Sequence, residues 1–369
     1  MKEYAAAAGR GLLKLLVTVL RPSPTVSMSQ YHSKELPSDK KTKMRLDSID
    51  QKLLNLLQAE FPLTRKPFAD LGLNLRITED DVIRRVGQLK ANGLIRQIGP
   101  VFDARSLGYK TTLVAMRAVE TKLDKAAEII IKHHGVSHAY ERDHHFNIWF
   151  TLSVPATVDM EVEVQRLTSA FSVETAFSLP AVKLFKLRAY FPLGGDGQKE
   201  TAMTNTNEAL RPEIKLSSED RAVINEVQQD LQLVPYPFAD MSARLRMAEE
   251  KFLSRCLSLL SRKVMRHFSA AVNHRHMGFA ANAMTCWVAP SEKIAAAGQK
   301  LASLREVSHC YERKTNEFWQ YNLFAMIHGH TKEACQEIAA EVAAETGLTD
   351  YVTLFSTREF KKTRVKYLV

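Results

Sequence analysis

The sequence predicts an α+β protein in which one unit, a winged helix-turn-helix followed by a ferredoxin-like βαββαβ domain, occurs twice in tandem. The first observation is repetition, because "PFAD" at residues 67–70 returns at 237–240 and "VSHAYER" at 136–142 returns as "VSHCYER" at 307–313. The second is the order of hydrophobic periods in each copy, helical first and then alternating between strands and helices. Two diverged tandem copies imply an internal pseudo-dimer whose halves need not do the same job.

Three segments at the start of the unit have the pattern of short helices. Apolar residues recur at helical spacing across residues 47–60, after an acidic first turn that suits the helix dipole. A short helix is expected around 68–71, and Thr78 can cap a third helix that Gly93 ends. Three short helices in this order are typical of a helix-turn-helix.

The segment after the third helix predicts the wing. Residues 94–109 have the pattern of a short strand, a turn and a second strand, which would complete a winged helix. The second copy repeats the pattern over residues 217–279, with Ser217 or Ser218 as the first cap and a third helix at 248–260.

Each wing is followed by alternating strand and helix patterns. In the first copy the expected order is strand 111–119, helix 124–134, strands 136–142 and 146–154, helix 158–171 and strand 176–190. This order predicts a ferredoxin-like sandwich of four antiparallel strands and two helices.

Composition also sets the domain limits. Residues 1–43 lack a packed pattern, so we expect a disordered tail or a misassigned upstream extension. Residues 194–213 are glycine-rich and polar, which predicts a flexible linker. The expected winged helices then cover 44–108 and 214–278, and the ferredoxin-like domains cover 109–193 and 279–369.

Charge and cysteine content limit the classes of partner. The formal net charge of +10 favours a polyanion such as nucleic acid, an anionic membrane or a small ligand with many carboxylates. All four cysteines lie in the second copy without a C-x-x-C pair, which indicates a reduced, cytoplasmic protein. The apolar stretch near the N-terminus is too short to span a bilayer, so we expect no membrane partner. The chain has no G-x-G-x-x-G or Walker loop and no convincing zinc spacing, so we expect no cofactor.

Acidic residues argue against specific DNA binding. The predicted recognition helix begins with Glu79, Asp80 and Asp81, and its counterpart in the second copy begins with Glu249 and Glu250. Carboxylates at this end would face a phosphate backbone, which is unfavourable against a polyanion. Their simpler role is to satisfy the helix dipole.

The order of domains resembles the Lrp/AsnC family of transcription regulators, and the hairpins resemble the siroheme decarboxylases, a branch with the same fold. The fused two-copy arrangement is the form that this branch takes in the haem d1 route. The first copy is similar to one subunit type at Arg142, His144, Phe146, Asn147, Trp149, Phe150 and Thr151. The second copy is similar to the partner type at Arg266, His274, Arg275, Gly278, Asn282, Trp287, Tyr321, Asn322, Leu323, Phe324, Met326, Ile327 and His328. Gln320 departs from this pattern, which usually has proline there.

The resemblance implies a definite reaction. Two acetate side chains of siroheme, which carries eight carboxylates, would become methyl groups to give 12,18-didecarboxysiroheme in haem d1 biosynthesis. This chemistry needs cations that hold the peripheral carboxylates, a scissile carboxylate kept from water, and an acid that protonates what remains. The iron belongs to the substrate, so the resemblance implies no cofactor and no metal site of the protein. The alternative function is an Lrp/AsnC-type regulator with a haem-like effector.

The resemblance also implies the site residues. We predict His144 and His274 as the catalytic acids. Substrate binding is predicted at Arg96, Arg105, Arg142, Asn147, Trp149, Arg266, Arg275, Asn282, Trp287, Arg313, Tyr321 and Asn322.

Other histidines and the partners leave alternatives open. His138 and His309 occupy equivalent positions in the two copies, which favours a structural role because a catalytic residue need act in only one. Either His328 or His330 could reach the siroheme iron as a neutral imidazole. The expected partner is siroheme, with sister decarboxylase subunits or self-association as further alternatives.

Overall fold

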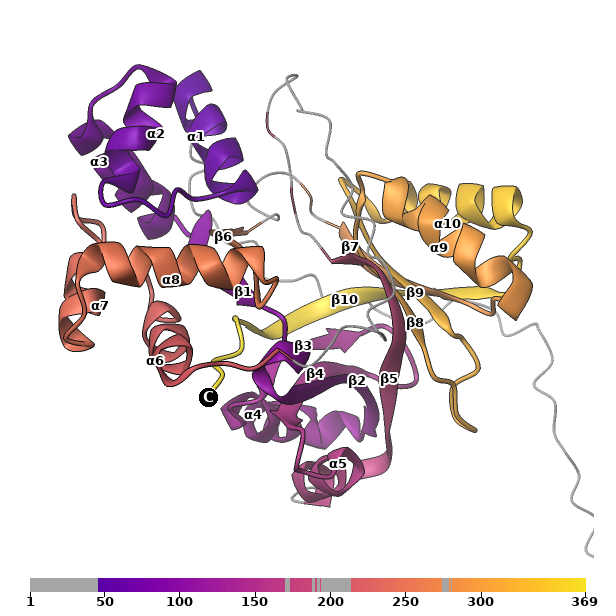
Figure 1. Ribbon diagram of the computed structural model, residues 1–369. Helices are drawn as coiled ribbons and strands as arrows, with labels where there is room; N and C mark the ends of the chain where they lie inside the picture. Colours follow the sequence, from indigo (N-terminus) through magenta and orange to yellow (C-terminus); the bar gives the residue numbers. More distant parts are fainter. Residues whose placement is uncertain are drawn as a thin grey trace, which may run out of the picture. The chain divides into compact units, whose positions relative to one another are not determined.

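The fold class and the tandem repeat are confirmed in a computed structural model (Figure 1). It describes residues 46–169, 173–187, 214–273 and 281–369, together with residues 190, 193 and 279. The expectations for residues 1–43 and for the linker at 194–213 lie outside this range, as do the predicted site residues His274 and Arg275. Within the described residues, no helix combines the length and the apolar character needed to cross a membrane.

Each copy opens with the three expected helices. Thr78 caps the third helix, because its Oγ1 accepts a hydrogen bond from the Asp81 N–H at 3.2 Å. Ser217 caps the first helix of the second copy in the same way, through Asp220 at 3.1 Å. The helices are α1 (Ser48–Ala59), α2 (Pro67–Leu75) and α3 (Glu79–Ala91), then α6 (Ser218–Val227), α7 (Ala239–Arg244) and α8 (Glu249–Ser261).

The wings pair with each other rather than folding back on themselves. Strand β1 (Ile95–Phe102) lies antiparallel to β6 (Met265–Val272), with Gly99 opposite Ser269. In the first copy the expected strand and turn are followed by a second strand from Tyr109, but β1 takes its partner strand from the wing of the other copy. A 3-10 helix (Arg105–Leu107) instead leads the chain from β1 into the next domain. The paired wings and the helices of both copies share one hydrophobic core.

Each ferredoxin-like domain has the expected βαββαβ order. The first comprises β2 (Tyr109–Ala118), α4 (Leu123–Lys132), β3 (Val136–Arg142), β4 (Ile148–Pro155), α5 (Met160–Ser169) and β5 (Val173–Leu187). The second comprises β7 (Ala281–Trp287), α9 (Ser291–Ser303), β8 (Val307–Arg313), β9 (Leu323–Gly329), α10 (Lys332–Thr346) and β10 (Tyr351–Lys362). Figure 1 shows α9 and α10 side by side against the strands of the second copy.

The two sheets close into one barrel with the strand order β10-β3-β4-β2-β5-β8-β9-β7. The last strand of each copy joins the sheets, because its first part pairs within its own copy and its second part pairs with the other. Strand β5 pairs with β2 up to Pro180 and with β8 from Ala181. Strand β10 pairs with β7 up to Phe355 and with β3 from Ser356.

The barrel wall has two different faces. Ala139 of β3 and Cys310 of β8 belong to the cores under the helices of their own copies. Because side chains alternate along a strand, the residues next to them face the barrel interior. The interior core draws residues from both copies, including Trp149, Leu179 and Phe324. A ligand that reaches the interior would therefore meet side chains of both copies.

Candidate functional site

Two arginines at equivalent positions project into the barrel interior. Arg142 ends β3 and Arg313 ends β8. Arg142 Nη1 donates a hydrogen bond to the carbonyl oxygen of Leu354 on β10 at 2.9 Å, and Arg313 Nη1 donates to that of Leu179 on β5 at 2.8 Å. Each guanidinium therefore binds the last strand of the other copy.

No carboxylate among the described residues forms an ion pair with Arg142 or Arg313, and the Nε of each is buried without a hydrogen-bond partner. Burial lowers the pKa of Arg142 to about 10 and also lowers the pKa of Arg313. The rings of Tyr140 and Tyr311 lie 5.5 and 4.7 Å from the respective guanidinium carbons. Both arginines thus remain cations at neutral pH, in a place suited to an anionic ligand.

Three histidines face the same interior. His138 and His309 lie near the starts of β3 and β8, and His328 lies near the end of β9. The Nδ1 atom of His138 is 2.9 Å from the Ser137 hydroxyl oxygen. In the second copy one hydroxyl contacts two rings, because Ser308 Oγ is 2.7 Å from both His309 Nδ1 and His328 Nε2.

These rings stay neutral at physiological pH. Burial lowers the pKa of His138 to about 3 and that of His309 to about 4, and holds the pKa of His328 well below its ordinary value. The positive charge of Lys362 is the second cause in all three cases. We call His138, His309, His328 and Lys362 the histidine cluster.

The predicted acid His144 lies apart from the histidine cluster. It follows the end of β3 that carries Arg142, whereas His138 lies near the start of that strand. Its Nδ1 accepts a hydrogen bond from the Phe146 N–H at 3.1 Å, and its ring is edge-on to Trp319 at 5.4 Å. Burial lowers the pKa of His144 to about 4. His144 therefore has a neutral ring and an aromatic setting.

Two asparagines that are predicted to bind substrate make hydrogen bonds to the backbone at strand ends in this structure. The Asn147 side chain accepts from the Ala118 N–H and donates to the Ala118 carbonyl, both at 2.9 Å. Asn322 makes the same pair of bonds with Ala289, both at 2.8 Å. Since each amide uses its oxygen and a donor on the backbone, the geometry gives both a structural role.

The predicted aromatic contacts are mostly core. Trp149 is buried and its Nε1 donates to the Phe146 carbonyl at 2.7 Å. Trp287 is fully buried in the core under the helices of the second copy, so it faces away from the barrel interior. Tyr321 is half-buried with its ring 5.1 Å from Trp319. Stacking of a macrocycle on Trp149 or Trp287 stays a prediction, since both rings are packed against protein in this structure.

The predicted wing arginines have different settings. Arg96 on β1 forms a 2.8 Å ion pair with Glu359 of β10. Arg266 on β6 is paired with Asp103 of the other copy. Arg105 is exposed. Arg96 is the one of these three that contributes positive charge near the histidine cluster, where it disfavours the charged form of His138.

Of the predicted residues, Arg142, Arg313 and Asn282 lie on the interior face of the barrel, and Asn282 is opposite His328 in the strand register. Arg96 lies near His138. Sequence reasoning did not assign a role to Ser308, and it set His138 and His309 aside as structural. The available signal was the pattern Ser-His-x-Tyr-x-Arg in both copies, because alternation puts its histidine, tyrosine and arginine on one strand face.

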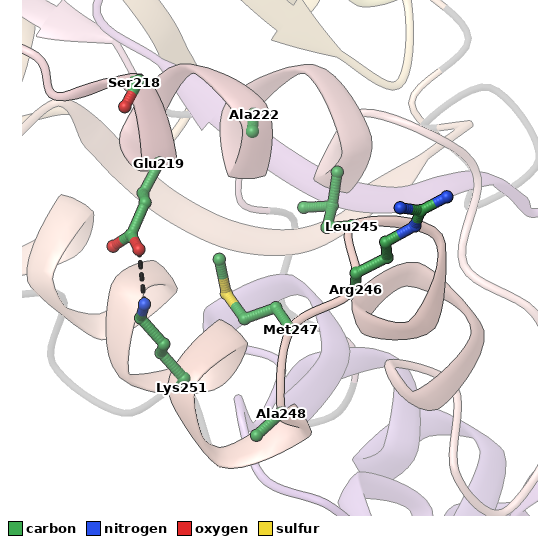
Figure 2. Close-up of a pocket in the computed structure, with 8 residues that line it drawn as sticks. All are labelled: Ser218, Glu219, Ala222, Leu245, Arg246, Met247, Ala248 and Lys251. Atoms are coloured by element: carbon green, nitrogen blue, oxygen red, sulfur yellow. Dashed lines mark hydrogen bonds and ion pairs between the residues drawn. The ribbon is translucent and has the colours of Figure 1, made fainter.

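Other kinds of site have less support. Figure 2 shows a hollow in the second helix-turn-helix, lined by Ser218, Glu219, Ala222, Leu245, Arg246, Met247, Ala248 and Lys251. Its Lys251 is bound by Glu219, so its charge is already neutralised. Across the described residues, His, Cys, Asp and Glu side chains form no group of three or more that could hold a metal ion.

Comparisons with known proteins match both copies. The model of the AsnC-like ligand binding domain matches residues 106–186 and 276–361, and that of the siroheme decarboxylase NirDL-like HTH domain matches 50–96 and 220–266. The siroheme decarboxylase of Hydrogenobacter thermophilus is 37% identical over 317 residues, which cover 86% of this chain and 94% of that protein.

Two further similar proteins are one with a crystal structure and one that is a separate subunit matched by 40% of this chain. A crystal structure of the siroheme decarboxylase NirDL in co-complex with an iron-uroporphyrin III analogue is 35% identical with a TM-score of 0.65, over 87% of this chain and 95% of that chain. The siroheme decarboxylase beta subunit of Methanosarcina barkeri is 38% identical over 147 residues, which cover 40% of this chain and 97% of that subunit.

Proposed function

This chain belongs to the siroheme decarboxylase family, and we propose that it converts two acetate side chains of siroheme to methyl groups, giving 12,18-didecarboxysiroheme. One observation carries the proposal. Arg142 and Arg313, one from each copy, hold positive charge in a shared interior without a neutralising carboxylate among the described residues. A substrate with eight carboxylates supplies the missing negative charge.

The reaction sets two tasks for the protein. Each acetate loses carbon dioxide, the electron pair of the broken bond stays on the side chain, and one proton must be added to complete the methyl group. The arginines and Lys362 favour the bound carboxylates, and the surrounding low dielectric strengthens that attraction. A neighbouring carboxylate also raises the pKa of a histidine, so substrate binding prepares the neutral rings to take up a proton.

The predicted acids keep their place in the proposal with different support. His274 lies outside the described residues. His144 lies near the opposite end of β3 from the histidine cluster, so it would act on a different part of the macrocycle from His138. The buried and free state of the four cysteines supports a reducing compartment, which is why we place the reaction in the cytoplasm.

The regulator alternative has little support from the recognition helices. Arg85 of α3 is bound by Asp47 at 2.8 Å, by Asp50 at 2.7 Å and by Asp81 at 3.0 Å. At the start of α8, Glu249 forms a 2.9 Å ion pair with the exposed Arg65 of the other copy. Cations that would meet phosphate are thus already bound by carboxylates.

Anaerobic incubation with siroheme, followed by mass analysis of the tetrapyrrole, tests the function. The expected product has lost two carbon dioxide units, and an Arg221→Ala variant of an exposed arginine on α6 serves as the matched control with wild-type turnover. Siroheme recovered intact from a protein that binds it would overturn the proposal. Sequence-specific nanomolar DNA binding at physiological salt would then favour the regulator.

We also propose that the fused chain turns over siroheme without separate sister subunits. Both copies contribute an arginine to one interior, which a single copy cannot do. Adding separate sister subunits should therefore leave the rate of the purified chain unchanged.

A further inference from the structure

The contacts of Ser308 distinguish the two copies of this chain. Its Oγ lies 2.7 Å from His309 Nδ1 and 2.7 Å from His328 Nε2. In the first copy Ser137 contacts only His138 among these histidine positions. The residue equivalent to His328 is Ser153, which contacts Thr111 Oγ1 at 2.8 Å. A chain of two imidazoles joined through one hydroxyl is therefore built in the second copy alone.

One hydroxyl between two rings couples their protonation. A serine hydroxyl carries one proton, so Ser308 donates to one ring nitrogen and accepts from the other. If His309 Nδ1 is the donor, the hydroxyl donates to His328 Nε2. If His328 Nε2 is the donor, the hydroxyl donates to His309 Nδ1. The tautomers of His309 and His328 thus change together when one proton enters the first ring from outside and another leaves the second ring.

We propose that Ser308 is a positioning residue that joins His309 and His328 into a proton relay, and that this relay supplies the proton that replaces one of the two carboxyl groups lost from siroheme. The inference rests on the proposed function. A proton from solvent binds His309 Nε2, the Nδ1 proton passes to Ser308 Oγ, and the hydroxyl proton passes to His328 Nε2. His328 then gives its Nδ1 proton to the side-chain carbon left by carbon dioxide, so one proton is consumed for that carbon dioxide. Both rings are left protonated on Nε2, and proton exchange with solvent returns them to the Nδ1–H form before the next turnover.

Exposure sets the direction of the relay. His309 is half-buried, whereas only 4% of His328 is exposed, so the proton enters at His309 and leaves from His328. The strand register places Asn282 opposite His328.

The charges around the relay keep it neutral until substrate arrives. Lys362, Arg313 and Lys186 disfavour the charged form of His309. Lys362, His309 and Arg142 do the same for His328. A bound polycarboxylate offsets these cations, which makes protonation of the rings favourable only in the complex.

The matched pair Ser308→Ala and Ser137→Ala tests the relay. Both remove a buried hydroxyl next to an equivalent histidine, but only Ser308 joins two rings. We expect Ser308→Ala to lower the anaerobic single-turnover rate by roughly 10- to 100-fold, with siroheme affinity unchanged. This is less than the roughly 100- to 10,000-fold contribution of a general acid, because the acid His328 itself stays in place. Ser137→Ala should stay near the wild-type rate, and Ser308→Thr should restore most of the loss because it keeps a hydroxyl.

A second readout separates proton delivery from a structural effect. In Ser308→Ala, proton transfer becomes the slow step, so the solvent deuterium isotope effect on the rate should rise above that of wild type and of Ser137→Ala. His328→Ser, which introduces the residue found at Ser153, should show the same rise without a hydroxyl deletion at Ser308. These shifts are not expected from a loss of packing.

The outcomes distinguish the relay from the function on which it rests. If wild type decarboxylates siroheme while Ser308→Ala and Ser137→Ala have equal rates and isotope effects, the relay is wrong and the function stands. If wild type binds siroheme and leaves it intact, both are overturned.

Discussion

Replacing Arg142 by methionine should separate the stability of this protein from its affinity for substrate. Arg142 is 4% exposed, and burial lowers its pKa from the ordinary value of an arginine to about 10. That difference corresponds to about 3 kcal/mol by which the folded state disfavours the charge, since one pKa unit is worth about 1.4 kcal/mol. Both pKa values lie above 7, so the full penalty applies at neutral pH.

The net change in stability is smaller than this penalty. Methionine cannot replace the 2.9 Å hydrogen bond to the Leu354 carbonyl, and a buried acceptor left without a partner costs about 1–3 kcal/mol. Arg142→Met should therefore leave the free energy of unfolding unchanged or raise it by up to about 2 kcal/mol. Most truncations of buried residues lower it.

Affinity should change in the opposite direction. Loss of a charge-assisted contact weakens binding by about 1.5–3 kcal/mol, which raises the Kd for a polycarboxylate tetrapyrrole roughly 10- to 150-fold. Denaturant unfolding and fluorescence-quench titration on wild type, Arg142→Met and the exposed control Arg221→Met measure both quantities. A loss of stability above about 2 kcal/mol with unchanged Kd would refute the reasoning.

Three further predictions follow from the described contacts. Burial lowers the pKa values of His138 and His309, so below pH 6.5 the unfolded state binds more protons than the folded state. The free energy of unfolding should therefore fall from pH 6.5 toward pH 4, and this slope should flatten in His138→Gln and in His309→Gln. Equal slopes in wild type and both variants would contradict this. Gly298→Ala should destabilise the protein by about 1–3 kcal/mol in denaturant unfolding, because a Cβ there would lie 2.4 Å from the Phe185 ring of the other copy. If that clash is the cause, the loss of stability should be smaller when Gly298→Ala is combined with Phe185→Leu. His144→Ala should lower the single-turnover rate while siroheme still binds, and a wild-type rate would remove His144 from the mechanism.

The sequence was sufficient for features that depend on local pattern. The repeated "PFAD" and "VSH-YER" segments predicted two copies, and the helix caps at Thr78 and Ser217 were correct because capping depends on residues within one turn. The pairing of β1 with β6 could not be predicted, since nothing in residues 94–109 shows that the strand finds its partner in the other copy. Barrel closure had one weak signal, the length of β5 and β10 at 15 and 12 residues.

Only part of the candidate site could be predicted, because the remaining contacts also depend on how the copies fold together. Motif resemblance selects Arg142, Asn147 and Trp149 together, but it cannot tell a side chain that faces the interior from one whose polar atoms are bound to backbone. The structural role of His309 stays a prediction. Its equivalence to His138 suggested that role, and symmetry could not show that Ser308 also contacts His328 in the second copy.

The exchange of last strands has a consequence for synthesis on the ribosome. Lys362 pairs with His138, so barrel closure joins residues more than two hundred positions apart in the chain. Until the second copy emerges, the nascent first copy presents the open edge of β3 and the second half of β5, from Ala181 on, without their partners. Exposed strand edges of this kind are templates for aggregation. Slow folding and dependence on chaperones during translation are therefore the expected cost of placing both halves of the barrel in one polypeptide.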